Sequence, residues 1–329
     1  MATLRLLARL STRPARIALR RALKGPLRPT WDYRTELAHG LMRGAVEEFV
    51  NEGPRWARDA QRRVAFPFRV PGVVVEARTS QLGGLLMRNI ERDGPTVFYC
   101  HGGGYVVGAP ETYRNLVGVL LSRGGRAVLP AYRLAPDHPY PAGLDDIERA
   151  YDLLREDTPA RRIILAGDSA GGGLCLGLLH RLKERGEPMP AGAYLLSPWT
   201  NPFALGGSID RNQATDVLAN DFGRWCARQV FGGMAERNPE AAAVRSDPTG
   251  YPPLLIQDGG AEMLADQIDE FVRLARDAGV FVEHDRAPDM FHVYQMWLGL
   301  VGEATRAVKE ARQWCHERIA DADRLSEVE

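Results

Sequence analysis

The stretch that decides the fold is Ile-Ile-Leu-Ala-Gly-Asp-Ser-Ala-Gly-Gly, residues 163–172. Its first residues are apolar and β-branched, which predicts a buried strand, and a helix-forming run follows Ser169. Gly167 and Gly171 flank the serine in a G-x-S-x-G pattern, typical of a sharp strand-to-helix turn that lifts the hydroxyl above a sheet. The N–H of Ala170 would then point at a developing oxyanion. Because a glycine-rich turn with an N-capping serine fits the same short pattern, its surroundings must decide between the two readings.

From about residue 72 the chain alternates short β-branched runs with helical patterns, which predicts a mostly parallel sheet covered by helices. We expect eight strands: Val73–Arg78, Leu85–Ile90, Thr96–Cys100, Ala127–Tyr132, Ile163–Gly167, Ala193–Leu196, Leu254–Asp258 and Val282–Ala287. Helices are expected at Tyr113–Arg123, Leu144–Arg155, Ala170–Arg185, Ala265–Ala278 and Val293–Arg318. The serine turn thus joins a central strand to a covering helix.

Two stretches do not follow this alternation, the first 55 residues and residues 200–245. The second follows a strand, and ligands of such folds bind at the carboxyl ends of the strands. We therefore expect residues 1–55 and 200–245 to pack together as a helical cap, over a core made of residues 56–199 and 246–329; surface decoration is the alternative.

A second glycine-rich segment, His101-Gly102-Gly103-Gly104, follows the predicted strand Thr96–Cys100 directly. Successive glycines leave backbone N–H groups uncovered, and an HGGG loop of this kind supplies half of the oxyanion hole in lipases and esterases. We expect the ring of His101 to hold the loop by hydrogen bonds and not to act as the base. A phosphate cradle is disfavoured because no Gly-Lys-Ser/Thr follows.

The catalytic base should lie far downstream, because hydrolases with this turn have the chain order serine, acid, histidine. His284 falls inside a predicted strand and His316 inside the last predicted helix. His292 follows a strand in a loop, where its ring can reach over the sheet. We therefore predict that His292 is the base.

The acid should follow the predicted strand Leu254–Asp258, where the carboxylates are Asp258, Glu262, Asp266 and Asp269. Glu262 lies just past the strand end. Asp266 opens the next helix, where a negative charge is favourable for the helix itself. Either carboxylate could orient a histidine, so Glu262 is our first choice and Asp266 the alternative.

The composition of the 329-residue chain excludes several function classes. The chain carries 42 basic and 42 acidic residues, so no global field favours nucleic acid. The four cysteines form no CxxC pair and no metal-ligand spacing, which indicates a reducing, cytoplasmic setting and no bound metal. We also expect no cofactor and no membrane-spanning helix.

The N-terminal 30 residues hold eight basic residues and no acid, with leucines at roughly helical spacing. Arginines interrupt every apolar run, so the segment lacks the order of a secretory signal. A transit-like peptide and a helix lying on a membrane surface remain open. The plainer expectation is an amphipathic helix packed on the main domain.

Taken together, these motifs resemble the hormone-sensitive lipase-like family of bacterial α/β-hydrolase esterases over roughly residues 65–329. The matching segments, in order, are HGGGYVVG at 101–108, YRLAPDHPYPAGLDD at 132–146, GDSAGGGL at 167–174, LLSPWT at 195–200, PPLLIQDGGAEMLAD at 252–266 and the loop of His292. The resemblance implies a capped α/β-hydrolase that cleaves short- to medium-chain acyl esters without a cofactor.

Residue by residue, the resemblance places a triad on Ser169, Glu262 and His292 and oxyanion donors on Gly103, Gly104 and Ala170. The motif residues His101, Gly102, Gly167, Asp168 and Gly171 would support them. The glutamate is similar to that of a subset of acetyl hydrolases and monoterpene lactone hydrolases, whereas many members carry aspartate. Asn201 departs from the aspartate that is common after the SPWT motif, and the basic N-terminus departs from the usual short start.

The expected partner is a small-molecule ester, with a lactone or an amide substrate as alternatives for the same triad. A ligand receptor is the non-enzymatic alternative, since plant gibberellin receptors resemble this family but lack the triad histidine. The presence of His292 favours an enzyme. A homodimer and a weak membrane-surface contact through the basic N-terminus also stay open.

Overall fold

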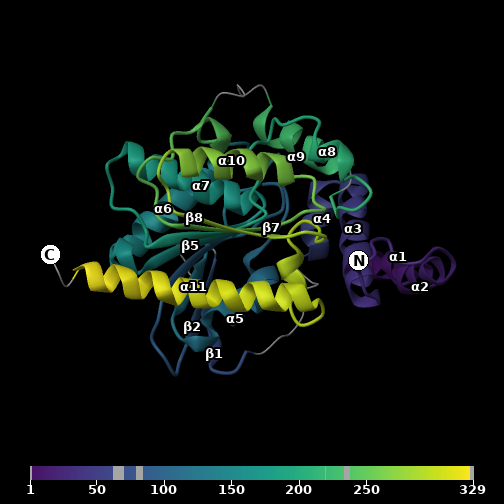
Figure 1. Ribbon diagram of the computed structural model, residues 1–329, viewed down its shortest axis with the longest axis horizontal. Helices are drawn as coiled ribbons and strands as arrows, with labels where there is room; N and C mark the ends of the chain where they lie inside the picture. Colours follow the sequence, from purple (N-terminus) through teal and green to yellow (C-terminus); the bar gives the residue numbers. More distant parts are fainter. Residues whose placement is uncertain (1, 62–69, 79–83, 219, 233–237, 327–329) are drawn as a thin grey trace.

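A computed structural model describes residues 2–61, 70–78, 84–218, 220–232 and 238–326 of the chain. Within these residues one eight-stranded sheet has the order β1-β2-β4-β3-β5-β6-β7-β8 (Figure 1). Its strands are β1 Val73–Arg78, β2 Leu85–Asn89, β3 Thr96–Cys100, β4 Arg126–Leu129, β5 Ile163–Asp168, β6 Gly192–Leu196, β7 Leu254–Gly259 and β8 Val282–Ala287. Strand β2 runs antiparallel to both β1 and β4, and the other neighbours are parallel.

Helices cover both faces of the sheet (Figure 1). One face carries α5 Arg114–Leu120 and α11 Gly302–Ser326, and the other carries α6 Ala142–Arg155, α7 Ala170–Glu184 and α10 Ala265–Asp277. This arrangement explains why every residue of β3 and of β6 is buried, since a parallel strand between two helical layers has no solvent face. The mostly parallel sheet with helices on both faces, which the alternating pattern predicts, is therefore confirmed.

Most of the expected elements lie where the sequence places them, but two predictions are wrong. The strand expected over Ala127–Tyr132 ends at Leu129, and Tyr132 lies in the following loop. The helix expected from Val293 begins only at Gly302. Val293 has a left-handed backbone (φ 50°), and Gly299 is also at positive φ (84°), so a short 3-10 turn, Tyr294–Trp297, replaces the first turns of that helix.

The remaining helices gather at one side of the sheet (Figure 1). They are α1 Ala2–Leu10, α2 Arg13–Lys24, α3 Tyr33–Glu52, α4 Pro54–Gln61, α8 Ser208–Arg211 and α9 Asn220–Phe231. Helix α3 packs against α9. In addition, Arg43 of α3 donates to the carbonyls of Gln213 (2.6 Å) and Asp216 (2.8 Å). The N-terminal stretch and the 200–245 stretch are therefore in direct contact.

None of the helices in the described ranges is both long and apolar enough to span a bilayer. All four cysteines are buried free thiols. The parallel strands β3, β5, β6, β7 and β8 bring their carboxyl ends to a single edge of the sheet, and the candidate catalytic residues lie at that edge.

Candidate active site

Ser169 sits at the sharp turn between β5 and α7. Its backbone has φ 52° and ψ −119°, a region that a residue with a side chain rarely adopts. Glycine is required on both sides: a Cβ on Gly171 would lie 2.0 Å from the carbonyl oxygen of Cys100, and a Cβ on Gly167 would lie 2.6 Å from the backbone of Gly171. The tight turn predicted from the G-x-S-x-G pattern thus holds the serine in a strained, raised position.

The HGGG loop lies beside this turn. Gly103 and Gly104 have positive φ angles of 113° and 62°. Within the described chain, no backbone acceptor takes the N–H of Gly103, of Gly104 or of Ala170, the first residue of α7. These three N–H groups are the expected oxyanion donors, and Gly104 and Ser169 line the same pocket.

Asp168 joins the turn to the loop. Its fully buried carboxylate accepts the N–H of Gly102 (2.8 Å) and the hydroxyls of Tyr99 (2.9 Å) and Tyr113 (3.1 Å). Burial raises the pKa of this carboxyl to about 6, although the three donors oppose the shift. A Cβ on Gly102 would lie 2.2 Å from the carboxylate, so the second residue of the loop must be glycine.

His101 is buried between the rings of Tyr132 and Tyr113. Its ring stacks on Tyr132 and Tyr113, with centroids 4.3 Å and 6.0 Å away, and its Nδ1 lies 2.8 Å from the carbonyl oxygen of Gly102. Burial lowers the pKa of His101 to about 4, so its ring is neutral at physiological pH. Tyr132, which the sequence placed in a strand, donates its hydroxyl to the carbonyl of His101 (2.8 Å).

Glu262 and His292 meet in the protein interior. Glu262 Oε1 lies 3.7 Å from His292 Nδ1, and neither atom has a hydrogen-bond partner among the described residues. Glu262 Oε2 accepts the hydroxyl of Ser197 (2.7 Å) and the N–H of Gly259 (2.9 Å). The two donors fix the carboxylate so that its free oxygen faces the imidazole. A separation of 3.7 Å is too long for a hydrogen bond, and contacts of this kind often shorten only when substrate binds.

Burial shifts the proton affinities of this pair in opposite directions. It lowers the pKa of His292, which keeps the imidazole neutral and able to accept a proton near pH 7. Burial, together with the nearby Asp258, raises the pKa of Glu262, while the donors from Ser197 and Gly259 oppose that rise. The histidine therefore begins as a free base beside a buried carboxyl group.

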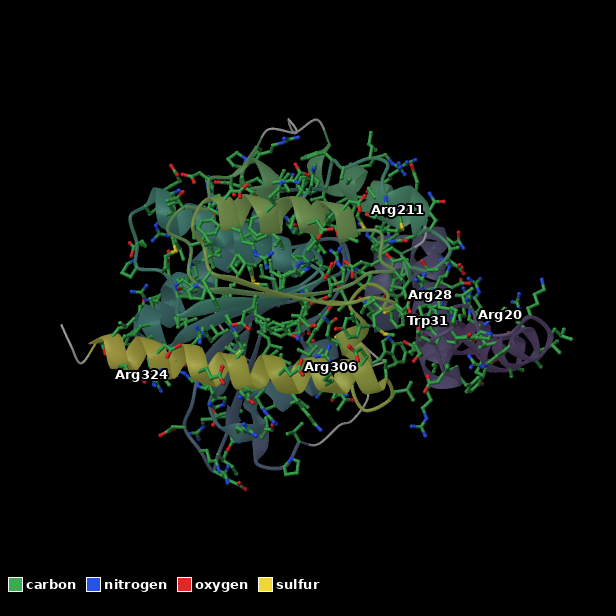
Figure 2. All side chains as sticks on the ribbon, viewed as in Figure 1. Arg20, Arg28, Trp31, Arg211, Arg306 and Arg324 are labelled. Carbon is green, nitrogen blue, oxygen red and sulfur yellow. The ribbon has the colours of Figure 1, made fainter. Side chains whose placement is uncertain are left out.

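The alternative acid, Asp266, is engaged elsewhere. Its carboxylate accepts the N–H of Ser208 (2.8 Å) and the guanidinium of Arg211 (2.7 Å), labelled in Figure 2. Its side chain is 46% exposed, at the start of α10. The other two candidates are also paired, Asp258 and Asp269 both with Arg286. Of the four carboxylates, Glu262 is the one that faces His292.

Sequence reasoning missed two residues that hold this pair in place. Ser197, at φ 44°, accepts the N–H of Val293 (3.1 Å) while donating to Glu262. Asp216 accepts the N–H of His292 (3.0 Å) with one oxygen and that of Met263 (2.7 Å) with the other. Ser197 belongs to the LLSPWT segment and could have been found there; nothing in the sequence near Asp216 signals its role.

The loop of His292 is also held by the N-terminal segment. Trp31 Nε1 donates to the carbonyl of Asp289 (2.7 Å), Thr30 donates its hydroxyl to the Asp289 carboxylate (2.8 Å), and Arg28 forms an ion pair with it (Figure 2). Trp31 packs edge-on against Phe291, the residue before His292. Residues 28–31 therefore contact the loop that carries His292.

Ser169 and Gly104 lie in a pocket with a volume of about 320 Å³. Its walls are largely apolar side chains from residues 199–227 and from the turn that precedes α10. They include Trp199, Phe203, Leu205, Ile209, Leu218, Phe222, Cys226, Met263 and Leu264. In the described part of the chain no group of three or more histidine, cysteine or acidic residues is placed to hold a metal ion. The pocket thus offers an apolar ligand a serine hydroxyl and a set of free N–H donors.

Comparisons with known proteins agree with this site. The family model described as alpha/beta hydrolase fold matches residues 97–296. An acetyl-hydrolase of Streptomyces hygroscopicus is 38% identical over 228 residues, 68% of this chain and 76% of that protein. The carboxylesterase NlhH of Mycobacterium tuberculosis is 30% identical over 277 residues, 78% of this chain and 86% of that protein.

Solved structures with a similar fold are also esterases or lipases of one family. The crystal structure of an esterase from the bacterial hormone-sensitive lipase family superposes with a TM-score of 0.78 at 31% identity and covers 86% of this chain and 98% of that one. A hormone-sensitive lipase from a metagenome library gives a TM-score of 0.78 at 32% identity, covering 84% and 97%. The chain therefore belongs to the hormone-sensitive lipase-like family of α/β-hydrolase carboxylesterases.

Proposed function

We propose that the protein hydrolyses carboxylic esters of short- to medium-chain acids through a triad of Ser169, His292 and Glu262 and an acyl-enzyme intermediate. The observation that carries this proposal is the buried Glu262–His292 pair at the sheet edge where Ser169 lines the apolar pocket. An N-capping role does not account for Ser169, because its side chain makes no capping hydrogen bond. A purely structural ion pair between Glu262 and His292 would not require a serine at the same sheet edge.

In the first half of the reaction His292 takes the proton of the Ser169 hydroxyl as the oxygen attacks the ester carbonyl. The carbonyl oxygen becomes an oxyanion, which the N–H groups of Gly103, Gly104 and Ala170 stabilise. One such donor typically contributes about 3–4 kcal/mol in the transition state. His292 then protonates the departing alcohol, and the acyl group remains on the serine.

In the second half a water molecule enters in place of the alcohol. His292 removes one proton from the water, whose oxygen attacks the acyl carbon, and the same three donors hold the second oxyanion. Collapse of this intermediate breaks the bond to Ser169, which recovers the proton from His292 as the carboxylic acid leaves. Glu262 stabilises the imidazolium of His292 in both halves of the reaction. It also orients the ring so that Nε2 of His292 is turned toward Ser169.

The size of the pocket supports the chain length. The pocket volume of about 320 Å³ is at the lower end of the roughly 300–1,000 Å³ that is typical of small-molecule sites. An acyl chain of a few carbons and a small alcohol together fill such a space, whereas a long-chain triglyceride does not. We therefore expect short- to medium-chain acyl esters to be the preferred substrates.

We assign the cap that shapes this pocket to residues 1–55 and 200–245, over a core of 56–199 and 246–329. The second stretch supplies the wall residues Phe203, Leu218 and Phe222. The first stretch supports it from outside, through contacts such as that of His39 Nε2 with the carbonyl oxygen of Asp216 (3.2 Å). Asn201 lines the entrance, and its N–H donates to Gln267 (2.7 Å). A neutral amide therefore stands where the family commonly carries a charge.

The test is turnover of p-nitrophenyl esters of graded acyl length, compared with a lactone and an anilide, by the wild type and by Ser169→Ala. We expect the variant to lose nearly all turnover and to stop reacting with a fluorophosphonate that labels the wild type at Ser169. Circular dichroism controls for folding. Full turnover by the folded variant would overturn the proposal. Preference for the lactone or the anilide would keep the triad and change the substrate class.

A further inference from the structure

The outward face of α2 is apolar, the reverse of a helix that buries its apolar stripe in a core. Leu19 and Leu23 are 62% and 74% exposed, and the alanines at 15, 18 and 22 on the same face are exposed as well. In Figure 1, α1 and α2 lie beyond α3, away from the sheet. Nothing in the described chain covers this face.

The charged face of α2 is turned inward, where it meets acidic residues of α3. Arg13 pairs with Glu47 (2.7 Å), and Arg21 pairs with the buried Glu36 (3.0 Å). Arg20, labelled in Figure 2, pairs with Glu36 as well. These ion pairs fix the rotation of α2 about its axis, so its leucines are held outward by the fold.

Helix α1 repeats the pattern on a smaller scale. Leu6 is buried (3% exposed), whereas Leu4 and Leu7 are 72% and 50% exposed. Arg9 pairs with Glu48 of α3, again on the inner side. We call α1 and α2, residues 2–24, the N-terminal hairpin; it presents four exposed leucines, Leu4, Leu7, Leu19 and Leu23, on two short helices.

The two helices also carry exposed cations that have no ion-pair partner in the described chain. Arg5, Arg16 and Lys24 are exposed, and the contacts of the described chain give none of them an acidic partner. Residues 1–31 contain eight basic residues and no acid. Exposed leucines accompanied by unpaired cations are complementary to an anionic lipid surface, where leucines enter the interface and cations meet headgroups.

We propose that the N-terminal hairpin docks the protein on anionic lipid surfaces. A second copy of the chain is the competing occupant, but residues 2–24 contain no acid that could pair with the exposed Arg16 and Lys24 of the other copy. The proposal is independent of the esterase assignment, because none of these residues lines the pocket.

The test is co-sedimentation of the full chain with vesicles of phosphatidylcholine alone and of phosphatidylcholine with phosphatidylglycerol. We expect sedimentation with the second vesicles, and at least a tenfold lower partition for the double variant Leu19→Glu/Leu23→Glu. Leu325→Glu is the matched control, because Leu325 is a 71% exposed leucine on α11. Arg16→Gln/Lys24→Gln should weaken binding as well, with Arg149→Gln on α6 as its control.

Unchanged ester turnover shows that each variant is folded. Failure of the wild type to sediment with anionic vesicles would overturn the proposal. So would sedimentation that Leu19→Glu/Leu23→Glu leaves unchanged, since arginines alone would then explain it. Light scattering that finds a wild-type dimer, converted to a monomer by the same double variant, would assign the face to a second copy instead.

Discussion

The two candidate acids lend themselves to a paired experiment, Glu262→Gln against Asp266→Asn. The amide of the first variant is nearly isosteric with the carboxylate, so packing is kept. Ser197 and Gly259 both donate to Glu262 Oε2, and an amide NH₂ cannot accept a hydrogen bond. The oxygen of the glutamine amide must therefore take the position of Oε2. The amide NH₂ then faces His292 Nδ1. It stabilises the tautomer with the proton on Nε2, which cannot take a proton from Ser169.

The magnitude follows from the distance of 3.7 Å between Glu262 Oε1 and His292 Nδ1. With an effective dielectric of about 20, a carboxylate and an imidazolium at this separation attract by about 4.5 kcal/mol. Loss of that attraction in the transition state lowers kcat roughly 10³-fold, and the wrong tautomer lowers it further. KM should change little, because neither group binds the ground-state ester.

Asp266→Asn removes a charge from a half-exposed pair with Arg211, 46% and 61% exposed, which contributes less than about 1 kcal/mol. We expect its kcat within twofold of the wild type. The assay is steady-state hydrolysis of a p-nitrophenyl ester at pH 8, with stability checked by urea unfolding. The assignment of the acid would be wrong if Glu262→Gln kept a tenth or more of the wild-type kcat. It would also be wrong if Asp266→Asn lowered kcat more than Glu262→Gln does.

Two further predictions concern the surroundings of the triad. In Asp216→Asn an amide NH₂ must face the N–H of His292 or of Met263, so we expect about 1–3 kcal/mol lower stability in urea unfolding and a lower kcat at unchanged KM. Because burial lowers the pKa of His292, its imidazole stays neutral below the usual value of 6.5. The acid limb of the pH profile of kcat/KM should therefore have its midpoint below pH 6.5. A midpoint above pH 7 would contradict this reasoning.

Much of the fold was predictable because its signals are local. The strands β1, β3 and β8 have the predicted bounds, and the serine turn lies where the G-x-S-x-G pattern placed it. Each of these signals depends on residues within a few positions of one another. The last helix was mispredicted for the same reason, since its apolar spacing continues through Val293 although the backbone there is left-handed.

The supports of the triad were not predictable because they connect distant parts of the chain. Asp216 accepts an N–H from a residue 76 positions away and another from 47 positions away. No periodicity or motif marks an aspartate for such a role, and its neighbours in the sequence are unremarkable. The rotation of α2 was equally hidden, because its helical pattern does not say whether the arginines or the leucines face α3.

Asp216 connects the proposed cap to the proposed catalytic residues. It lies in the 200–245 stretch, its carboxylate holds the loops of the base and of the acid, and its carbonyl accepts from Arg43 (2.8 Å) of α3. Residues 28–31 hold Asp289 in the base loop, and they continue directly from the N-terminal hairpin. A cap that only covered the pocket would need none of these contacts. Because the geometry of His292 depends on both stretches, the structure joins pocket shape, base position and the N-terminal surface in a single packed assembly.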